Sequence, residues 1–199
     1  MTGTPTRPSP VQRTDPAAFR SPHGLRTNAA RALWRVVWAL LFRPSPPRLG
    51  SGWRRLLLRM FGARLGRCWI HPAVRVWAPW RLTVGSDTYV DSGVWIYNAF
   101  GCRIGDRAVV SMDVLLCSAT HDYTSPTYEL TGGAVTIGAD CWIAARAFVG
   151  PDVAVGEGAV VGACAVVTRD VPPWTVAAGN PARVLKTREL VAGPTPPQP

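Results

Sequence analysis

The chain has 199 residues, enough for one domain with a sizeable core and little more. Its net charge of +10 is unevenly placed: residues 1–67 hold 13 arginines and a single acid, whereas residues 68–199 hold 9 basic and 11 acidic residues. A basic N-terminal segment on a near-neutral body argues against a nucleic-acid-binding protein and suits an anionic surface, and 17% charged residues argue against a long helical bundle.

Residues 1–27 have the Pro-, Arg- and Thr-rich composition of a disordered tail. They contain no apolar stretch that would serve as a signal peptide. The five cysteines show neither a CxxC pair nor clustering with histidine, which is typical of reduced thiols and argues against a metal site. We therefore expect a cytoplasmic protein without a bound metal.

Residues 28–67 form a basic segment with two apolar stretches, 30–42 and 53–61, that we predict to be amphipathic helices. Asn28 is a suitable N-cap for the first, and Pro44 ends it after Arg43. Its longest uninterrupted apolar run, Val36 to Phe42, is too short to cross a bilayer. Two compatible interpretations remain: the helices cover the domain that follows, or they lie on an anionic membrane at its inner face.

An aliphatic residue recurs every six positions from residue 84 onward, and this period decides the fold. Neither an α-helix nor a hairpin has a period of six, whereas a short strand followed by a corner does, and three such units close one triangular coil. Stacked coils bury the aliphatic residues in the interior, after a less regular first pair at Ile70 and Val76. The regular positions, which predict four coils, are Val84, Val90, Ile96, Ile104, Val110, Leu116, Ile137, Ile143, Val149, Val155, Val161 and Val167.

The period is interrupted twice, between Ile96 and Ile104 and between Leu116 and Ile137. Both interruptions follow the third aliphatic residue of a coil, so the two insertions leave the prism at the same corner. The shorter insertion holds residues 98–101, and the longer is a loop opened by His121. A regular scaffold that departs from its pattern twice at one corner has the organisation of a functional site.

His121 is the candidate general base of that site. An imidazole removes a proton from a hydroxyl or amine at neutral pH, and His121 marks the exit from the scaffold into the long loop. His23 and His71 have no neighbours that suggest chemistry. Because no serine or cysteine lies in a nucleophile elbow, direct transfer without a covalent enzyme intermediate is the simpler scheme.

The sequence resembles the hexapeptide-repeat acyltransferases, and within them the sugar O-acetyltransferases of the maltose, galactoside and colanic-acid type. The strings that carry the resemblance are FRPSPPRLGSGWRRLLLRMFGA, THDYTSPTYEL and VTIGADCWIAARAFVGPDVAVGEGAVVGACAVVTRDVPPWTVAAGNPARVLK. The resemblance implies a left-handed parallel β-helix over residues 68–186, with N-terminal α-helices, one long loop extruded from a corner and a C-terminal tail at 187–199. It also implies a homotrimer with active sites between adjacent prisms.

The activity implied by the resemblance is transfer of an acetyl group from acetyl-CoA to a carbohydrate hydroxyl, in exopolysaccharide or cell-surface glycan biosynthesis, with lipid-linked sugars among the acceptors. His121 matches the family's catalytic base. The acceptor-binding positions fall on Asp91, where the family usually has Asn, and on Asn98 and Glu129. The coenzyme positions fall on Ala145, Ala163, Thr168, Arg169, Arg183 and Lys186, and the three cations suit the phosphates of the coenzyme.

Three other functions compete with this one. An acyltransferase for serine or another small amine would use the same base and coenzyme. A non-catalytic β-helix scaffold would need neither the His121 loop nor the basic C-terminal cluster. A metal-dependent carbonic anhydrase on this scaffold needs three histidine ligands, and only His71 and His121 lie outside the N-terminal tail.

Overall fold

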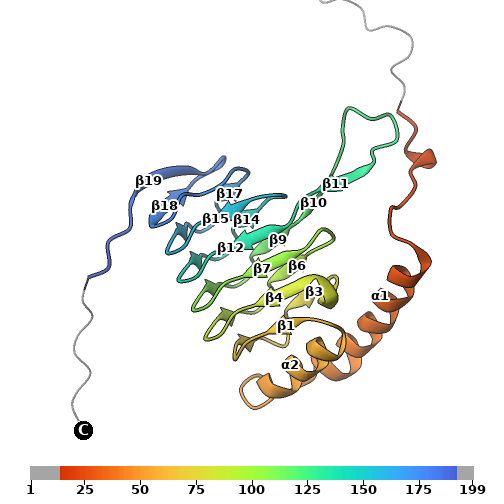
Figure 1. Cartoon of the computed structure of the whole chain (residues 1–199), viewed down its shortest axis with the longest axis horizontal. Helices are drawn as coiled ribbons and strands as arrows, with labels where there is room; N and C mark the ends of the chain where they lie inside the picture. Colours follow the sequence, from red (N-terminus) through yellow and green to blue (C-terminus); the bar gives the residue numbers. More distant parts are fainter. Residues whose placement is uncertain (1–13, 192–199) are drawn as a thin grey trace, which may run out of the picture.

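A computed structural model describes residues 14–191, which form a three-sided parallel β-helix of about six turns with helices at its N-terminal end (Figure 1). Face A consists of β1 (Arg64–Leu65), β4 (Leu82–Val84), β7 (Cys102–Ile104), β12 (Val135–Ile137) and β15 (Ala154–Val155). Face B consists of β2 (Trp69–Ile70), β5 (Tyr89–Val90), β8 (Val109–Val110), β13 (Trp142–Ile143), β16 (Val160–Val161), β18 (Thr175–Ala178) and β19 (Arg183–Thr187). Face C consists of β3 (Arg75–Val76), β6 (Trp95–Tyr97), β9 (Leu115–Cys117), β14 (Phe148–Val149) and β17 (Val166–Val167).

The predicted aliphatic residues fill the interior of the prism. Each of the twelve is at most 2% exposed, and the strand register stacks them turn upon turn, as with Val84 and Ile104 on face A. The less regular pair also belongs to a turn, because β2 and β3 pair with β5 and β6. The period did not predict the last turn, since Val171 follows Val167 by only four residues, yet Val171 bridges to Val155 and β18 pairs with β16.

The corners make two different demands on the sequence. Gly105, directly after a buried aliphatic residue, lies so close to the next turn that a Cβ atom would come 2.6 Å from the Ala139 nitrogen. Two residues further on, Arg107 has a φ of 53°, and the same left-handed conformation recurs at this position around the prism, at Asp140 and Cys164 among others. At Gly105 the first position therefore selects glycine for space, whereas the left-handed third position accepts glycine, as at Gly158, or a larger side chain such as that of Arg107.

Donor side chains from the N-terminal helices satisfy the free carbonyl edge of the first turn. These helices are α1 (Leu25–Val37), the π-helical turn η2 (Trp38–Phe42) and α2 (Ser51–Met60). The donor and acceptor pairs are Trp34 to Val76 O, Trp38 to Val74 O, Arg54 to Ile70 O, Arg55 to Cys68 O and Arg59 to Leu65 O, at 2.6–2.8 Å. Tryptophan and arginine only donate, so they suit an edge that presents oxygens. The structure thus supports the interpretation in which the helices cover the domain. Three of the N-terminal arginines have a structural role, because they bond to the carbonyl edge.

Two boundaries differ from prediction at this end. The helix α1 begins at Leu25 with Gly24 as its N-cap, so the prediction that Asn28 caps it is wrong; the Asn28 amide instead donates to the His23 carbonyl at 3.2 Å. The first strand also starts inside the segment expected to be helical, because Gly62, with φ at 89°, turns the chain from α2 onto face A. The helical stretch does end before Arg43 and Pro44, as predicted.

The rest of the chain closes the fold. Residues 14–24, expected within the disordered tail, run back along the molecule with one 3-10 turn, η1 (Pro16–Ala18), and reach the long loop (Figure 1). At the C-terminal end β19 folds back antiparallel onto β18. Of the other residues expected in the two tails, 25–27 begin α1, Thr187 ends β19 and Arg188 bonds to the prism, so the predicted tail boundaries are wrong at both ends. Residues 1–13 and 192–199 lie outside the described part of the chain. Within residues 14–191 no helix has the length and apolar character needed to cross a membrane.

Candidate active site

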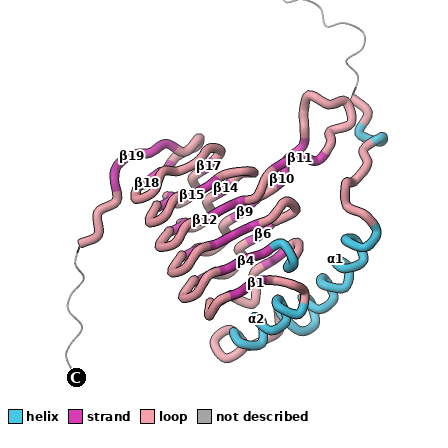
Figure 2. The backbone as a smooth tube through the Cα atoms, in the orientation of Figure 1, coloured by secondary structure: helices cyan, strands magenta, loops and turns pink. Residues whose placement is uncertain are grey.

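Three neighbouring turns carry extra residues at one corner of the prism, between face C and face A. We call it the insertion corner, and it comprises residues 77–81, 97–101 and 117–134. The first of these segments, which contains the 3-10 turn η3 (Pro79–Arg81), was not predicted. The third leaves the prism as the antiparallel hairpin of β10 (Ala119–His121) and β11 (Leu130–Gly132), as Figure 2 shows.

Buried hydrogen bonds hold the three segments together. The Asn98 amide accepts from the Ala78 N–H at 3.0 Å and donates to the Ala78 carbonyl at 2.8 Å. The Ser118 hydroxyl accepts from the Phe100 N–H at 2.9 Å and lies 3.0 Å from the Tyr97 carbonyl. Asn98 is wholly buried. In this chain both polar atoms of the side chain bond to Ala78 and position the corner, and the predicted contact of Asn98 with an acceptor stays a prediction.

The His121 ring is held in one tautomer by its own loop. Its Nδ1 atom lies 2.6 Å from the Tyr128 carbonyl oxygen. A carbonyl oxygen only accepts, so Nδ1 carries the proton and a neutral ring has its free electron pair on Nε2. Tyr128 adopts a left-handed φ of 52°, a costly conformation for a bulky residue. The loop thus presents Nε2 of an exposed His121 as a proton acceptor.

The N-terminal segment contacts this histidine, a relationship that no sequence pattern indicated. The Phe19 ring packs edge-on against the His121 ring, with the centroids 5.6 Å apart. The Asp15 N–H donates to the Pro126 carbonyl of the loop at 2.8 Å. Residues 14–24 therefore form a strap from α1 to the candidate base, and Phe19 provides an apolar wall beside it.

Two predicted acceptor-binding acids occupy different places. Glu129 lies in the His121 loop, where hydrogen bonds from the Ser125 and Thr127 hydroxyls hold the pKa of its carboxyl below the usual range. Asp91 follows β5 at the corner between faces B and C, and its carboxylate accepts the Ser92 N–H at 2.6 Å. One chain therefore brings Glu129 near His121 and places Asp91 on another corner.

The predicted coenzyme residues lie on the C-terminal half of the prism. Ala145 and Ala163 occupy successive turns of the corner between faces B and C, and neither N–H has a hydrogen-bond partner among residues 14–191. Thr168 and Arg169 are exposed beyond β17, at the corner between faces C and A but two turns beyond the insertion corner. Arg183 and Lys186 are exposed on β19 at the edge of face B. A single chain thus divides these residues between two corners and one sheet edge.

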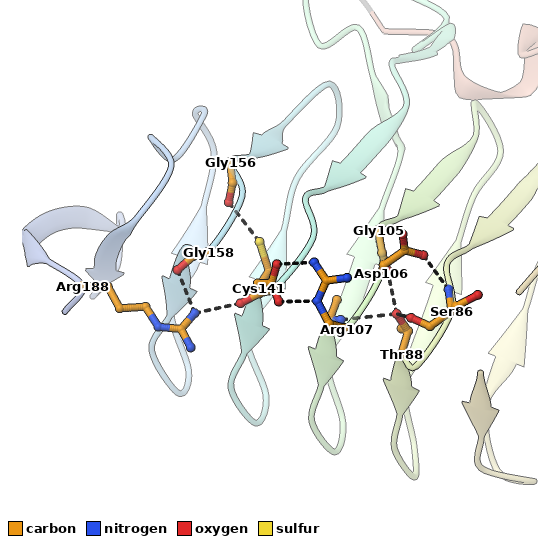
Figure 3. A network of polar contacts seen from close by, with 11 residues as sticks. Ser86, Thr88, Gly105, Asp106, Arg107, Cys141, Gly156, Gly158 and Arg188 are labelled. Carbon is orange, nitrogen blue, oxygen red and sulfur yellow. Dashed lines mark hydrogen bonds and ion pairs between the residues drawn. The ribbon is translucent and has the colours of Figure 1, made fainter. Parts of the chain in front are cut away.

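A polar network along the corner between faces A and B fixes the C-terminal segment, as Figure 3 shows. Arg107 and Asp140, from successive turns, form a bidentate pair with both distances at 2.7 Å. The Arg188 guanidinium donates to the Asp140 and Gly158 carbonyl oxygens at 2.8 Å each. No sequence pattern indicates Arg188, which anchors the chain just after the predicted coenzyme residues of β19.

The cysteines and the metal-ligating residue types add no further centre. All five cysteines are free thiols, and burial raises the pKa of Cys102 to about 12. Cys164 is the exposed one, beside Ala163. Within residues 14–191 no group of three or more His, Cys, Asp or Glu side chains is arranged to hold a metal ion.

Comparison with known proteins shows which family this chain belongs to. Residues 134–169 match the model of the bacterial transferase hexapeptide, six repeats. The chain is 38% identical over 177 residues to WcaF of Escherichia coli, and the match covers 87% of this chain and 97% of WcaF. The name of that protein describes it as a colanic acid biosynthesis acetyltransferase. The chain belongs to the hexapeptide-repeat acetyltransferases.

Solved structures agree with this family. A galactoside acetyltransferase in complex with coenzyme A is 25% identical, with a TM-score of 0.77 over 85% of this chain and 86% of that one. A maltose O-acetyltransferase from Clostridium difficile 630 is 26% identical, with a TM-score of 0.74 over 84% and 90%. The left-handed parallel β-helix with N-terminal helices and an extruded loop is confirmed, and the chain is an acetyltransferase.

Proposed function

We propose that this chain transfers an acetyl group from acetyl-CoA directly to a carbohydrate hydroxyl, with His121 as the general base. The observation that carries the proposal is the contact between His121 Nδ1 and the Tyr128 carbonyl, which leaves Nε2 free to accept a proton. The similarity to a protein named for colanic acid biosynthesis and to galactoside and maltose acetyltransferases supports a sugar acceptor.

The reaction follows from these groups. Nε2 of His121 takes the proton of the acceptor hydroxyl while the oxygen of that hydroxyl attacks the thioester carbonyl carbon. Because the Tyr128 carbonyl lies on Nδ1, it stabilises the imidazolium that forms. Unpartnered backbone N–H groups, of which Ala145 offers one, suit the oxyanion of the tetrahedral intermediate. When the carbon–sulfur bond breaks, His121 returns its proton to the departing thiolate.

A second copy of the chain completes the site in this proposal. His121 and the Ala145 corner lie on different corners of one prism, so one active site draws its base and its coenzyme residues from adjacent prisms. Face B also leaves apolar side chains exposed, among them Tyr89, Val109 and Trp142, and such a face gains from burial. We expect a homotrimer, in which Arg169, Arg183 and Lys186 meet the coenzyme phosphates.

The outer surface of the N-terminal helices suits contact with an anionic membrane. Leu33, Val36 and Leu40 follow one another at helical spacing, with Leu33 at 58% and Leu40 at 67% exposed. On α2, Met60 (71% exposed) and Trp53 also lie at helical spacing, so each helix exposes a row of apolar side chains. The Trp53 indole donates to the Leu41 carbonyl and so connects the two rows. Such apolar stripes beside arginines are typical of interfacial helices.

Replacement of the base tests the catalytic proposal. We expect His121→Ala to keep the fold and the oligomer, measured by circular dichroism and size-exclusion chromatography, and to lose at least about 10²-fold in kcat. His71→Ala is the matched control, because His71 lies in the first turn and accepts the Ala73 N–H through Nδ1. Unchanged turnover of His121→Ala would remove the base from the mechanism. Acetylation of an amine panel in preference to sugars would favour the small-amine alternative.

Vesicle co-sedimentation tests the membrane contact separately. The wild-type chain should pellet with anionic vesicles at low salt and be released at high salt, because juxtamembrane basic residues contribute about 1 kcal/mol each. Leu33→Gln/Leu40→Gln should weaken this binding without changing the acetyl transfer to a soluble acceptor. Equal binding to neutral and anionic vesicles would contradict the proposed contact with an anionic membrane. The helices would then serve only to cover the first turn of the prism.

A further inference from the structure

A polar groove lies on face A and reaches the insertion corner, with which it shares Arg81, Phe100 and Ala134. Its volume is about 370 Å³, and its walls come from the first three turns. Three arginines line it: Arg64 on β1, Arg81 at the end of η3 and Arg103 on β7. We call it the arginine groove.

The strand register places these cations in a regular array. Arg64 pairs with Thr83, and Thr83 pairs with Arg103, so one column of face A reads Arg, Thr, Arg. Two strand spacings separate the arginine Cα atoms by about 10 Å. Both side chains point outward, because the next residues along their strands, Leu65 and Ile104, face the interior.

The array carries positive charge without a protein counter-charge. Within residues 14–191, Arg64, Arg81 and Arg103 take part in no ion pair, and the ion pairs that do form involve other arginines. Three like charges around one groove repel one another unless an anion lies between them. Guanidinium groups bind phosphate oxygens through two parallel hydrogen bonds, and two of them on either side of a hydroxyl suit a diphosphate.

The remaining wall of the groove adds aromatic surface. Trp80 and Phe100 line it beside the arginines, and Phe100 is 37% exposed. An aromatic ring next to a cluster of cations accommodates the apolar face of a sugar ring or of a carrier attached to the phosphate. Such a lining distinguishes the groove from a site for a bare inorganic ion.

The groove lies close enough to His121 for one ligand to reach both. Ala134, which ends the His121 loop, belongs to the wall of the groove. His121 lies two residues beyond Ala119 along β10, and Ala134 lies two residues beyond Gly132, the partner of Ala119, so the path from the groove to His121 is roughly 15 Å at most. A sugar that is joined to a diphosphate is of comparable length.

We infer that the arginine groove binds the diphosphate of an acceptor sugar, so that the sugar reaches His121 with its phosphates held by Arg64, Arg81 and Arg103. This inference rests on the proposed function for its acceptor. The anion site itself does not, because diphosphate binding requires no acetyl transfer.

The first experiment measures the anion site alone. Inorganic pyrophosphate is titrated into the intact chain by calorimetry, and Arg64→Gln/Arg103→Gln should bind it at least about tenfold more weakly, because hydrogen bonds to charged groups are lost. Arg26→Gln/Arg48→Gln is the matched control: it removes the same charge at two exposed positions outside the groove. Absence of pyrophosphate binding by the wild type overturns the inference, and so does an equal loss in the control, which would show non-specific attraction.

The second experiment identifies the ligand that carries the diphosphate. A nucleoside-diphosphate sugar and a polyprenyl-diphosphate sugar are compared as acceptors with the same sugar lacking phosphate. In Arg64→Gln/Arg103→Gln the KM of at least one diphosphate acceptor should rise about tenfold or more, with the KM for acetyl-CoA unchanged. A rise in the KM for acetyl-CoA instead would assign the groove to the coenzyme and overturn the inference. If neither sugar is acetylated, the proposed function fails, and displacement of pyrophosphate by these sugars still decides what the groove holds: displacement supports the inference and its absence overturns it.

Discussion

Replacing Arg54 is the sharpest test of how the N-terminal helices are fastened to the prism. Its side chain is wholly buried, with no acid beside it. Nε donates to the Ile70 carbonyl at 2.6 Å, and the two terminal nitrogens donate to the Pro46 and Pro47 carbonyls at 2.9 and 2.6 Å and to the Ser45 hydroxyl. The guanidinium therefore joins α2, the turn before it and the first coil.

The expected loss of stability follows from the carbonyl oxygens that lose their hydrogen-bond donor. Arg54→Met keeps the length of the stem but takes the donor from the buried Ile70 carbonyl and from the part-buried Pro47 carbonyl, whereas the Pro46 carbonyl keeps the Gly50 N–H. Each carbonyl left without a donor costs about 1–3 kcal/mol. Relief from burying the charge offsets part of this sum, so we expect a net loss of about 3 kcal/mol. For a chain of this length that corresponds to a fall of about 10 °C in Tm.

Thermal unfolding followed by circular dichroism measures the effect. Arg48→Met is the matched control, because Arg48 is exposed and within residues 14–191 forms neither a hydrogen bond through its side chain nor an ion pair. Arg54→Lys, which keeps the charge but cannot reach all the carbonyls, should fall between the two. A Tm for Arg54→Met equal to that of the control would refute the reasoning.

Four further predictions concern the strap, the corners and the exposed thiol. Phe19→Ala should lower kcat roughly tenfold by freeing the His121 ring, and an unchanged kcat would show that the contact does not position the base. Burial, helped by nearby arginines, lowers the pKa of His23, so the strap is fully docked above about pH 6.5 and loosens as the pH falls below it; tryptic cleavage after Arg20 should accelerate on acidification in the wild type but not in His23→Gln. Gly105→Ala should cost about 1–3 kcal/mol of stability in urea unfolding, since its Cβ would meet the Ala139 backbone, and a neutral effect would mean that the corner has room. Cys164 should react with a thiol reagent while Cys102 does not, and acetyl-CoA should protect it if the coenzyme passes the neighbouring Ala163; labelling unaffected by acetyl-CoA would place the coenzyme elsewhere.

The sequence predicted those parts of the structure that repeat. The period of six placed every regular aliphatic residue correctly in the interior, because each strand needs an aliphatic side chain at the same inward-facing position. It also located the insertion corner and the loop that presents His121. The last turn was missed because an irregular spacing before Val171 hides the period, although the burial requirement is the same there.

Contacts between distant, non-repeating segments could not be predicted in this way. No pattern in the sequence indicates that the Asn98 amide bonds to a buried backbone pair twenty residues away. The contact of Phe19 with His121 depends on the path of the strap, which has no periodicity. The arginine groove combines two strands and a 3-10 turn that the hexapeptide pattern treats as ordinary positions. These contacts join side chains that are far apart in the sequence, and the spacing of the aliphatic residues carries no information about which of them meet.

The donor side chains that line the first carbonyl edge decide how far the stack can extend. A bare β-helix ends in open strand edges, and identical ends would let molecules add to one another into a fibre. Here Trp34, Trp38 and three arginines occupy the oxygens of one end, and at the other end face B finishes in the antiparallel strand β19. Head-to-tail stacking needs an open edge at both ends, so the covered oxygens of the N-terminal end are enough to prevent it. The flanks of the prism stay available to neighbouring copies, and an active site shared between neighbours would lie there.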